Sequence, residues 1–291
     1  MAAPKRHQPA PSDDATRRER LSQLERILGG YERLLVAYSG GVDSAFLLQV
    51  AVDTLGDSRV LAVLGDSESL PRHEREQAVE LAARIGAPLR LVRTREIDDP
   101  NYARNPLNRC YFCKSELYDQ LRQIAAAEGF DAIADGTNAD DVGDFRPGRQ
   151  AAEERGVISP LLEVGLHKEE IRCLSRERGL PTWDKPAMPC LASRIPFGEA
   201  VDPEKLRQVE RAEEALQECG IRGGRVRHHG QIARLEVPEA ALATLADPQQ
   251  RQRLVAGVRA AGFLYVAVDL EGYRRGRLHE TRTGSGEAHS G

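Results

Sequence analysis

The sequence predicts an α/β protein: a domain built on a parallel sheet, followed by a smaller C-terminal α+β domain. Over the first half, short apolar runs take turns with amphipathic stretches of helical period. This rhythm is typical of parallel strands that helices cover on both faces. The rhythm ends after Asn138, and near Asp202 a new pattern starts, with a helix and then two short strands around Gly230. The change of pattern predicts the second domain.

Each element of the first half has its own local signal. A helix is expected from Thr16 to Leu28, because two glycines end its apolar period. The expected strands are short apolar runs, whereas the expected helices carry apolar residues three and four positions apart. In chain order, the expected elements are strand 33–39, helix 43–56, strand 59–67, helix 71–86, strand 88–96, helix 114–130 and strand 131–138.

The second half is more irregular. A polar loop with a short helix leads to a helix at 167–180, and the proline-rich stretch "PTWDKPAMPCLASRIPFG" follows without periodicity. We expect the domain boundary near Phe197. Beyond it we expect a helix at 202–219, a pair of strands around Gly230, helices across 238–261 and a strand at 263–270. The expected domains are 16–197 and 198–280, with a flexible arm at 1–15 and a flexible tail at 281–291.

Composition limits the possible partners. The 291 residues are 41% hydrophobic and carry a net charge of −4, which provides no general basic field for nucleic acid. No apolar run reaches the roughly 18–20 residues that span a bilayer, and the N-terminus has no apolar signal core. An odd number of cysteines, five, does not suggest a disulfide framework. We therefore expect a cytoplasmic protein that binds neither nucleic acid nor membrane.

The stretch "SGGVDS" joins an expected strand to an expected helix. Backbone N–H groups of such a turn, at the positive end of a helix, bind phosphate, and glycines let the oxygens approach. The hydroxyl groups of Ser39 and Ser44 add donors, and the carboxylate of Asp43 is suited to a Mg²⁺ ion that bridges it to phosphate. The alternative is a turn that merely uses glycine. The predicted phosphate-binding residues are Ser39, Gly40, Gly41, Val42, Asp43 and Ser44.

"SGGVDS" resembles the signature of the ATP pyrophosphatases, or PP-loop proteins. The resemblance implies that the loop holds the pyrophosphate of ATP while a substrate oxygen attacks the α-phosphate, so that AMP is attached and pyrophosphate leaves. "DGTNADD", at the end of the fourth expected strand, resembles the second nucleotide loop of that class. It adds Gly136, Thr137 and Asn138 to the expected ATP site, and Asp140 to the expected magnesium ligands. The loop defines the class but not the substrate.

Three cysteines suggest sulfur or metal chemistry. Cys110 and Cys113 form a CxxC just before an expected helix, and Cys190 lies in the irregular stretch. A zinc site needs four ligands, whereas three thiolates fit a [4Fe–4S] cluster with one iron open for an extra sulfide. The alternative is that the CxxC forms half of a structural zinc site, or that its spacing arises by chance. Cys173 and Cys219 fall inside helical patterns, where we expect them to pack.

Together, "RCYFCK", "DGTNADD", "CLASRIPFG" and "VRHHGQIARLEV" resemble the LarE-type ATP-dependent sulfur transferases, over about 33–275. The resemblance implies that ATP activates a carboxylate of a pyridinium-3,5-biscarboxylate mononucleotide, which becomes a thiocarboxylate on the way to the nickel-pincer nucleotide of lactate racemase. It also implies a homo-oligomer. Some members sacrifice the sulfur of the cysteine that matches Cys190 and leave dehydroalanine; others use a cluster, for which the ligands here are Cys110, Cys113 and Cys190.

An anionic nucleotide needs cations. Arg225 and Arg227 alternate along an expected strand, which directs both to one face, and guanidinium groups suit phosphate. A solvated strand face is the alternative, and the resemblance favours phosphate. Arg194 is a further phosphate candidate. "GYRRGRL", near the C-terminus, is expected to be a surface tail, and Trp183 is expected to pack.

Two other functions stay open. Some tRNA thiolases of the PP-loop class also use a CxxC and a third cysteine, although the acidic charge balance and the lack of a recognisable RNA module argue against them. The third alternative is a nucleotide- or zinc-binding protein without turnover.

Overall fold

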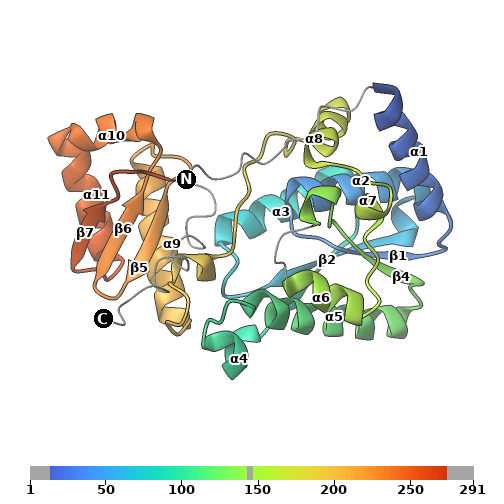
Figure 1. The fold of residues 1–291 in the computed structure, drawn as a ribbon, viewed down its shortest axis with the longest axis horizontal. Helices are drawn as coiled ribbons and strands as arrows, with labels where there is room; N and C mark the ends of the chain where they lie inside the picture. The colour runs from blue at the N-terminus through green and yellow to red at the C-terminus, as the bar shows by residue number, and fades with distance from the viewer. Residues whose placement is uncertain (1–13, 143–146, 274–291) are drawn as a thin grey trace, which may run out of the picture. The chain divides into compact units, whose positions relative to one another are not determined.

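The structure is a computed structural model, and it describes residues 14–142 and 147–273 (Figure 1). The expected flexible tail lies outside these residues, and so do all but the last two residues of the expected arm, which begin the first helix. All but the first two residues of "GYRRGRL" also fall outside. The chain divides into two compact units, Met1–Glu96 with Asn108–Met188, and Ile97–Leu107 with Pro189–Gly291.

The first unit is built on a four-stranded sheet in the order β3-β2-β1-β4, and every neighbouring pair is parallel. A parallel bridge between Ala134 and Ile158 extends the sheet beyond β4. The prediction of a parallel-sheet domain is therefore confirmed. The strands are β1 (Leu34–Ala37), β2 (Val60–Asp66), β3 (Leu89–Arg93) and β4 (Ala132–Asp135).

Helices cover both faces of this sheet (Figure 1). Leu34 and Val36 of β1 belong to the core on one face, and Leu35 and Ala37 to the core on the other, because successive strand side chains point to opposite faces. On the first face lie α1 (Asp14–Gly29), α2 (Val42–Leu55), α3 (Arg72–Ile85), α7 (Pro160–Glu163) and α8 (Lys168–Glu177); on the second lie α5 (Arg109–Glu128) and α6 (Pro147–Glu154).

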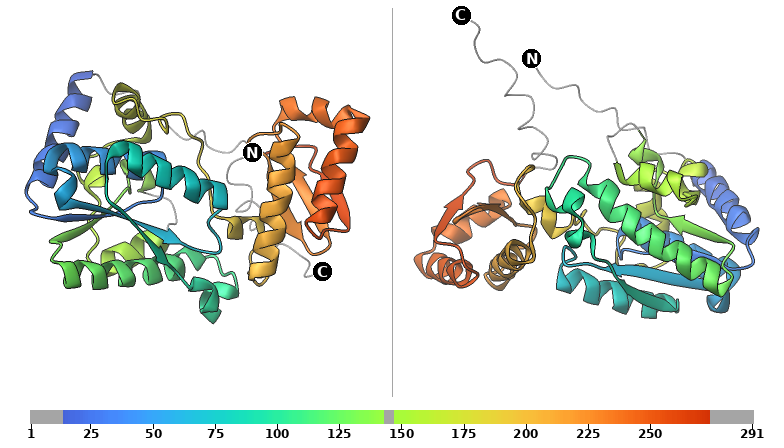
Figure 2. Two further views of the ribbon diagram at one scale, coloured as in Figure 1. Left: turned by 180° about the vertical axis from the view of Figure 1, so that it is seen from behind. Right: turned by 90° about the horizontal axis from the view of Figure 1, so that it is seen from below.

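The second unit is a small α+β body, as the sequence predicts. Its sheet has the order β5-β6-β7, with an antiparallel hairpin at Gly230, where φ is +60°, and a parallel β6–β7 pair. Helices lie on one face of this sheet and close a second core (Figure 2). The elements are α9 (Pro203–Glu218), β5 (Arg225–His229), β6 (Ile232–Glu236), α10 (Glu239–Ala246), α11 (Pro248–Ala260) and β7 (Tyr265–Val268).

Residues 97–107, with the short helix α4 (Pro100–Ala103), belong to the second unit. Asn105 explains why: it is buried, and its side-chain amide donates to the carbonyl oxygens of Ile195 (3.3 Å) and Pro196 (2.7 Å). Its own carbonyl accepts from the N–H of Gly198 at 3.0 Å. These bonds group 97–107 with 189–197 in the second unit, whereas the sequence pattern predicted both stretches to lie in the first domain.

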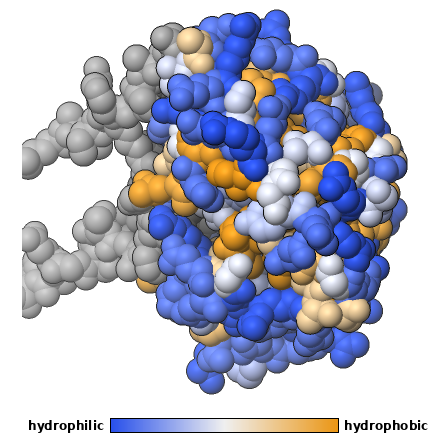
Figure 3. All heavy atoms as spheres, turned by 90° about the vertical axis from the view of Figure 1, so that its right-hand side faces the viewer, coloured by the Kyte–Doolittle hydropathy of each residue, from blue (hydrophilic) through white to orange (hydrophobic). Residues whose placement is uncertain are grey.

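Hydrophilic residues dominate the surface turned to the viewer in Figure 3, with apolar areas between them. Within the two described ranges, no helix is both long enough and apolar enough to cross a bilayer.

Candidate active site

The glycine loop lies where β1 ends and α2 begins, at the carboxyl edge of the parallel sheet, where α/β proteins bind ligands. Gly40 has a φ of +70°, and a Cβ on it would lie 2.5 Å from the Cβ of Ala78 in α3. The hydroxyl groups of Ser39 and Ser44 lie 3.0 Å apart, inside the turn. Since Gly41 is the N-cap and offers no side chain, the first N–H groups of α2 have no side-chain cap. This geometry suits an anion.

Asp43, in the first turn of α2, forms an ion pair with Lys168, which lies far from it in the sequence. Its Oδ2 accepts a hydrogen bond from the amine of Lys168 at 2.5 Å. Its Oδ1 is buried and accepts no hydrogen bond from any residue that the structure describes. Burial raises the pKa of Asp43, and Lys168 opposes the rise. The pair therefore presents one unoccupied carboxylate oxygen and one cation beside the glycine loop.

Asp140 is held by the start of α8. Its Oδ1 lies 2.9 Å from Nδ1 of His167, and its Oδ2 accepts the backbone N–H of Lys168 at 2.7 Å. Burial by itself raises the pKa of Asp140, but these two bonds outweigh it, and the pKa lies below its usual value. Both oxygens of Asp140 are thus engaged with protein groups.

The second predicted loop touches the first. A Cβ on Gly136 would lie 2.8 Å from the backbone nitrogen of Ser44, so only glycine allows this approach. Asp135, just before it, accepts from the hydroxyl groups of Tyr118 (2.9 Å) and Ser159 (2.8 Å), and from Thr137 through both its hydroxyl group and its N–H. Four hydrogen bonds to one buried carboxylate fix the shape of this loop against the glycine loop.

For magnesium, the two expected ligands fit unequally. Oδ1 of Asp43 is an orphaned carboxylate oxygen, which is the kind of ligand that Mg²⁺ takes together with phosphate oxygens. Asp140, in contrast, would first have to leave His167 and Lys168. Asp43 is therefore the residue that would hold the ion beside ATP.

The CxxC lies inside α5 and not before it, which corrects the expected start of this helix. Asn108 is the N-cap, so Cys110 is the second residue of the helix and Cys113 is the fifth. The ammonium group of Lys114, next in the chain, lies 5.3 Å from the centre of the Tyr118 ring. Tyr118 and the carboxylate of Asp135 raise the pKa of Lys114 despite its burial, so this helix end carries a positive charge.

The third cysteine, Cys190, is partly buried and belongs to the other unit. Within residues 14–142 and 147–273, no three His, Cys, Asp or Glu side chains form a group that could hold a metal ion. The CxxC thus supplies two cysteine side chains on neighbouring turns of one helix, and the third expected ligand, Cys190, lies in the other unit.

The three expected phosphate-binding arginines all lie in the second unit and are buried. Arg227 pairs with Glu236 at 2.7 Å, and Arg194 pairs with Glu213 at 2.8 Å. Arg225 lies over the ring of Tyr273, 5.1 Å from its centre. Burial lowers the pKa of Arg225, and the neighbouring charge of Arg194 lowers it further.

Two minor expectations were wrong. Cys173 is exposed on α8, because its position in the helix faces away from the buried Ile171 and Leu174. Trp183 is 36% exposed and does not plug a core; its ring instead lies 5.0 Å from the guanidinium group of Arg176. Cys219 is buried in the second core, as expected.

Three residues of the site were not predicted from the sequence: Lys168, His167 and Lys114. The available signal for the first two was a pair of basic residues at the start of a helix that follows the second loop. For Lys114 the signal was a lysine directly after the CxxC.

Comparison with known proteins shows relatives over part or nearly all of the chain. The NAD synthase family model matches residues 25–105, which contain the glycine loop. An uncharacterized protein of Synechocystis sp. is 47% identical over 264 residues, 91% of this chain and 98% of that protein. The pyridinium-3,5-bisthiocarboxylic acid mononucleotide synthase of Lactiplantibacillus plantarum is 36% identical over 272 residues, 92% of this chain and 97% of that protein. A tRNA-5-methyluridine(54) 2-sulfurtransferase of Pyrococcus horikoshii is 36% identical, over only 41% of this chain.

The parallel sheet with a glycine-rich phosphate loop at its carboxyl edge defines an ATP-dependent enzyme of the PP-loop class. The likeness to the synthase extends over both units, well beyond the matched ATP-binding part. The chain belongs to the family of that synthase, the LarE-type sulfur transferases.

Proposed function

We propose that this enzyme uses ATP to activate a carboxylate of pyridinium-3,5-biscarboxylate mononucleotide and converts it to a thiocarboxylate, for the nickel-pincer nucleotide cofactor. The observation that carries the proposal is the 36% identity to the L. plantarum synthase over 97% of that protein. The tRNA sulfurtransferase match, by contrast, covers 39% of its own chain, which gives no support for a tRNA substrate. A cytoplasmic location and an assembly of several copies remain expectations.

In the first step, a carboxylate oxygen of the substrate attacks the α-phosphorus of ATP, an O–P bond forms, and pyrophosphate leaves. The glycine loop and the second loop, with Gly136, Thr137 and Asn138, would bind the nucleotide. Mg²⁺, when bound at Asp43, would neutralise phosphate charge. The amine of Lys168, 2.5 Å from Asp43, is placed to compensate the charge that develops as pyrophosphate leaves.

In the second step, a sulfur nucleophile attacks the activated carbonyl carbon and AMP leaves. If Cys190 is the donor, its Sγ forms a thioester; loss of the Cα proton and cleavage of the Cβ–S bond then leave dehydroalanine and release the thiocarboxylate. We propose instead that a cluster on Cys110, Cys113 and Cys190 carries the sulfide. The three cysteines would hold the cluster, and the cluster would supply the sulfide. Arg225 and Arg227 are the proposed ligands of the substrate phosphate.

The test measures pyrophosphate, AMP and product mass with purified protein, ATP and either the pyridinium biscarboxylate nucleotide or a tRNA transcript. We expect pyrophosphate and a thiocarboxylate product with the nucleotide only, and neither from Asp43→Ala protein that is still folded. Thiolated tRNA would replace this function with that of a tRNA thiolase. ATP binding without pyrophosphate from either substrate would leave a binding protein without turnover.

A further inference from the structure

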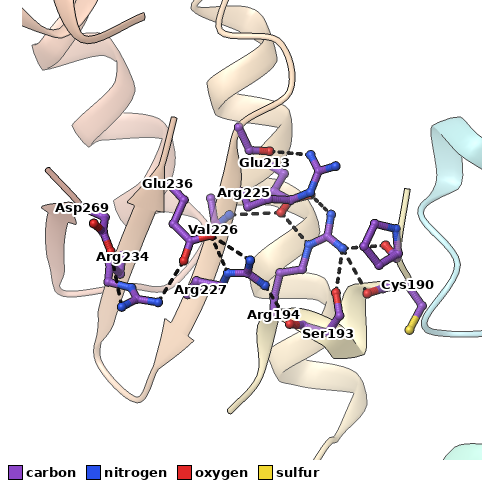
Figure 4. A network of polar contacts seen from close by, with 12 residues as sticks. Cys190, Ser193, Arg194, Glu213, Arg225, Val226, Arg227, Arg234, Glu236 and Asp269 are labelled. Atoms are coloured by element: carbon purple, nitrogen blue, oxygen red, sulfur yellow. Dashed lines mark hydrogen bonds and ion pairs between the residues drawn. The ribbon is translucent and has the colours of Figure 1, made fainter. Parts of the chain in front are cut away.

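The guanidinium group of Arg194 is occupied by protein groups on every nitrogen (Figure 4). Nε and Nη2 donate to the two carboxylate oxygens of Glu213 at 2.8 and 2.9 Å. Nη1 donates to the carbonyl oxygens of Pro189 (2.5 Å) and Cys190 (3.1 Å). It also lies 3.0 Å from the hydroxyl oxygen of Ser193. The exposed fraction of Arg194 is 0%.

Glu213, the partner of Arg194, is itself hydrogen-bonded to the sheet of the second unit. Glu213 lies on α9, and its Oε1 accepts both Nε of Arg194 and the backbone N–H of Val226 in β5, at 3.0 Å. A continuous chain of hydrogen bonds therefore runs from the main chain at Cys190, through Arg194 and Glu213, to β5 (Figure 4).

The same network holds the turn that follows Cys190. Nη1 of Arg227 donates to the carbonyl oxygen of Ser193 at 2.9 Å, and the N–H of Ser193 donates to the carbonyl oxygen of Cys190. Leu191 and Ala192, between them, are buried. The main chain that carries Cys190 is thus fixed by contacts on several sides, while the thiol-bearing side chain is left partly exposed.

A phosphate could reach Nε and Nη2 of Arg194 only by displacing Glu213, whose carboxylate is buried, and Nη1 only by displacing the main-chain carbonyl oxygens beside Cys190. An uncompensated buried carboxylate is strongly unfavourable, so this exchange is disfavoured. Arginine forms two parallel bonds to a carboxylate, a geometry that fixes direction as well as position. We propose that Arg194 and Glu213 position Cys190 for the sulfur step, and that Arg194 does not bind the substrate phosphate. This inference rests on the proposed function.

The two roles of Arg194 predict opposite effects of Glu213→Gln. If Arg194 bound phosphate, loss of its carboxylate partner would make the cation more available and lower KM for the nucleotide. A positioning role leaves that KM and pyrophosphate release unchanged and lowers kcat for thiocarboxylate formation, by about tenfold to a hundredfold, because small misplacements of a reacting group cost rates of that size. Arg194→Met should likewise lower kcat for thiocarboxylate formation and leave KM and pyrophosphate release unchanged. The double variant should have a kcat no lower than that of either single variant, since the two residues act as a unit.

A second measurement does not depend on activity. Amide hydrogen exchange in 190–195 should accelerate in Arg194→Met and Glu213→Gln protein. It should not change in Arg211→Met protein, which alters an exposed arginine of α9, the helix that carries Glu213. If Arg194→Met does not fold, Arg194→Lys takes its place. A raised KM with unchanged kcat in the Arg194 variants, or unchanged amide exchange in 190–195, overturns the inference. Wild-type protein that releases no pyrophosphate with the nucleotide refutes the proposed function instead, and the exchange result still stands.

Discussion

The amine of Lys168 donates to the carboxylate of Asp43 at 2.5 Å, which joins the first turn of α8 to the first turn of α2. The two residues are 125 positions apart in the chain. The contact places a cation at the phosphate loop and also controls the ionisation of the only carboxylate in that loop.

Removal of the Lys168 amine should shift the pH dependence of pyrophosphate release. Burial raises the pKa of Asp43 and Lys168 opposes the rise, so in Lys168→Met protein the pKa rises further. Asp43 must be ionised to hold Mg²⁺. Activity is therefore lost as the pH falls through this pKa, and the acidic limb of kcat/KM for pyrophosphate release should move to higher pH in the variant. Lys205→Met, which alters a lysine paired with Asp202 on α9, is the control. An acidic limb that stays in place would show that Asp43 does not set it.

Gly40→Ala should destabilise the first unit more than Gly56→Ala does. Both glycines have positive φ, +70° and +84°, so both variants carry the backbone penalty of about 1–2 kcal/mol. Only at Gly40 would the new Cβ also meet Ala78, at 2.5 Å, whereas nothing lies within 4 Å at Gly56. The free energy of unfolding from urea titrations measures the difference, and pyrophosphate release should be lost in Gly40→Ala alone. Equal destabilisation of the two variants would contradict the close approach of α3.

Arg225→Ala and Arg227→Ala should weaken binding of the pyridinium nucleotide far more than binding of ATP. Each lost charge-assisted contact is expected to cost about 1.5–3 kcal/mol. The fold should survive Arg227→Ala, because Arg234 still pairs with Glu236 at 2.9 Å. Titration calorimetry with each ligand measures the effect, and Arg234→Ala, in the same network, is the control. If ATP affinity falls and nucleotide affinity does not, these arginines serve another site.

Anaerobically purified protein is expected to be coloured and to contain iron and sulfide. Cys110→Ser, Cys113→Ser and Cys190→Ser should each greatly reduce both, because three thiolates are the proposed ligands. Cys173→Ser, at an exposed position outside this set, should leave the iron content unchanged. Colourless protein that loses the mass of H₂S at Cys190 after one turnover would instead identify Cys190 as a sacrificial donor.

Much of this protein can be read from local sequence. The strands, the helices between them, the pair of strands around Gly230 and the glycine loop were all predicted, because apolar periodicity and turn glycines act over a few residues. The helix that carries the CxxC begins earlier than expected, at Arg109, after the N-cap Asn108, although asparagine is a residue type favoured at that position. Cys173 was expected to pack because cysteine is usually buried, and only its angular position on α8 directs it to solvent.

The sequence by itself determined the fold class, the two loops and the set of chemically capable residues. The tertiary structure alone decided which of them meet. It pairs Asp43 with Lys168, holds Asp140 on His167, and pairs Arg194 with Glu213. The physical reason is that charges far apart in sequence become partners only when helices and strands pack, and burial then obliges each one to find a counter-charge.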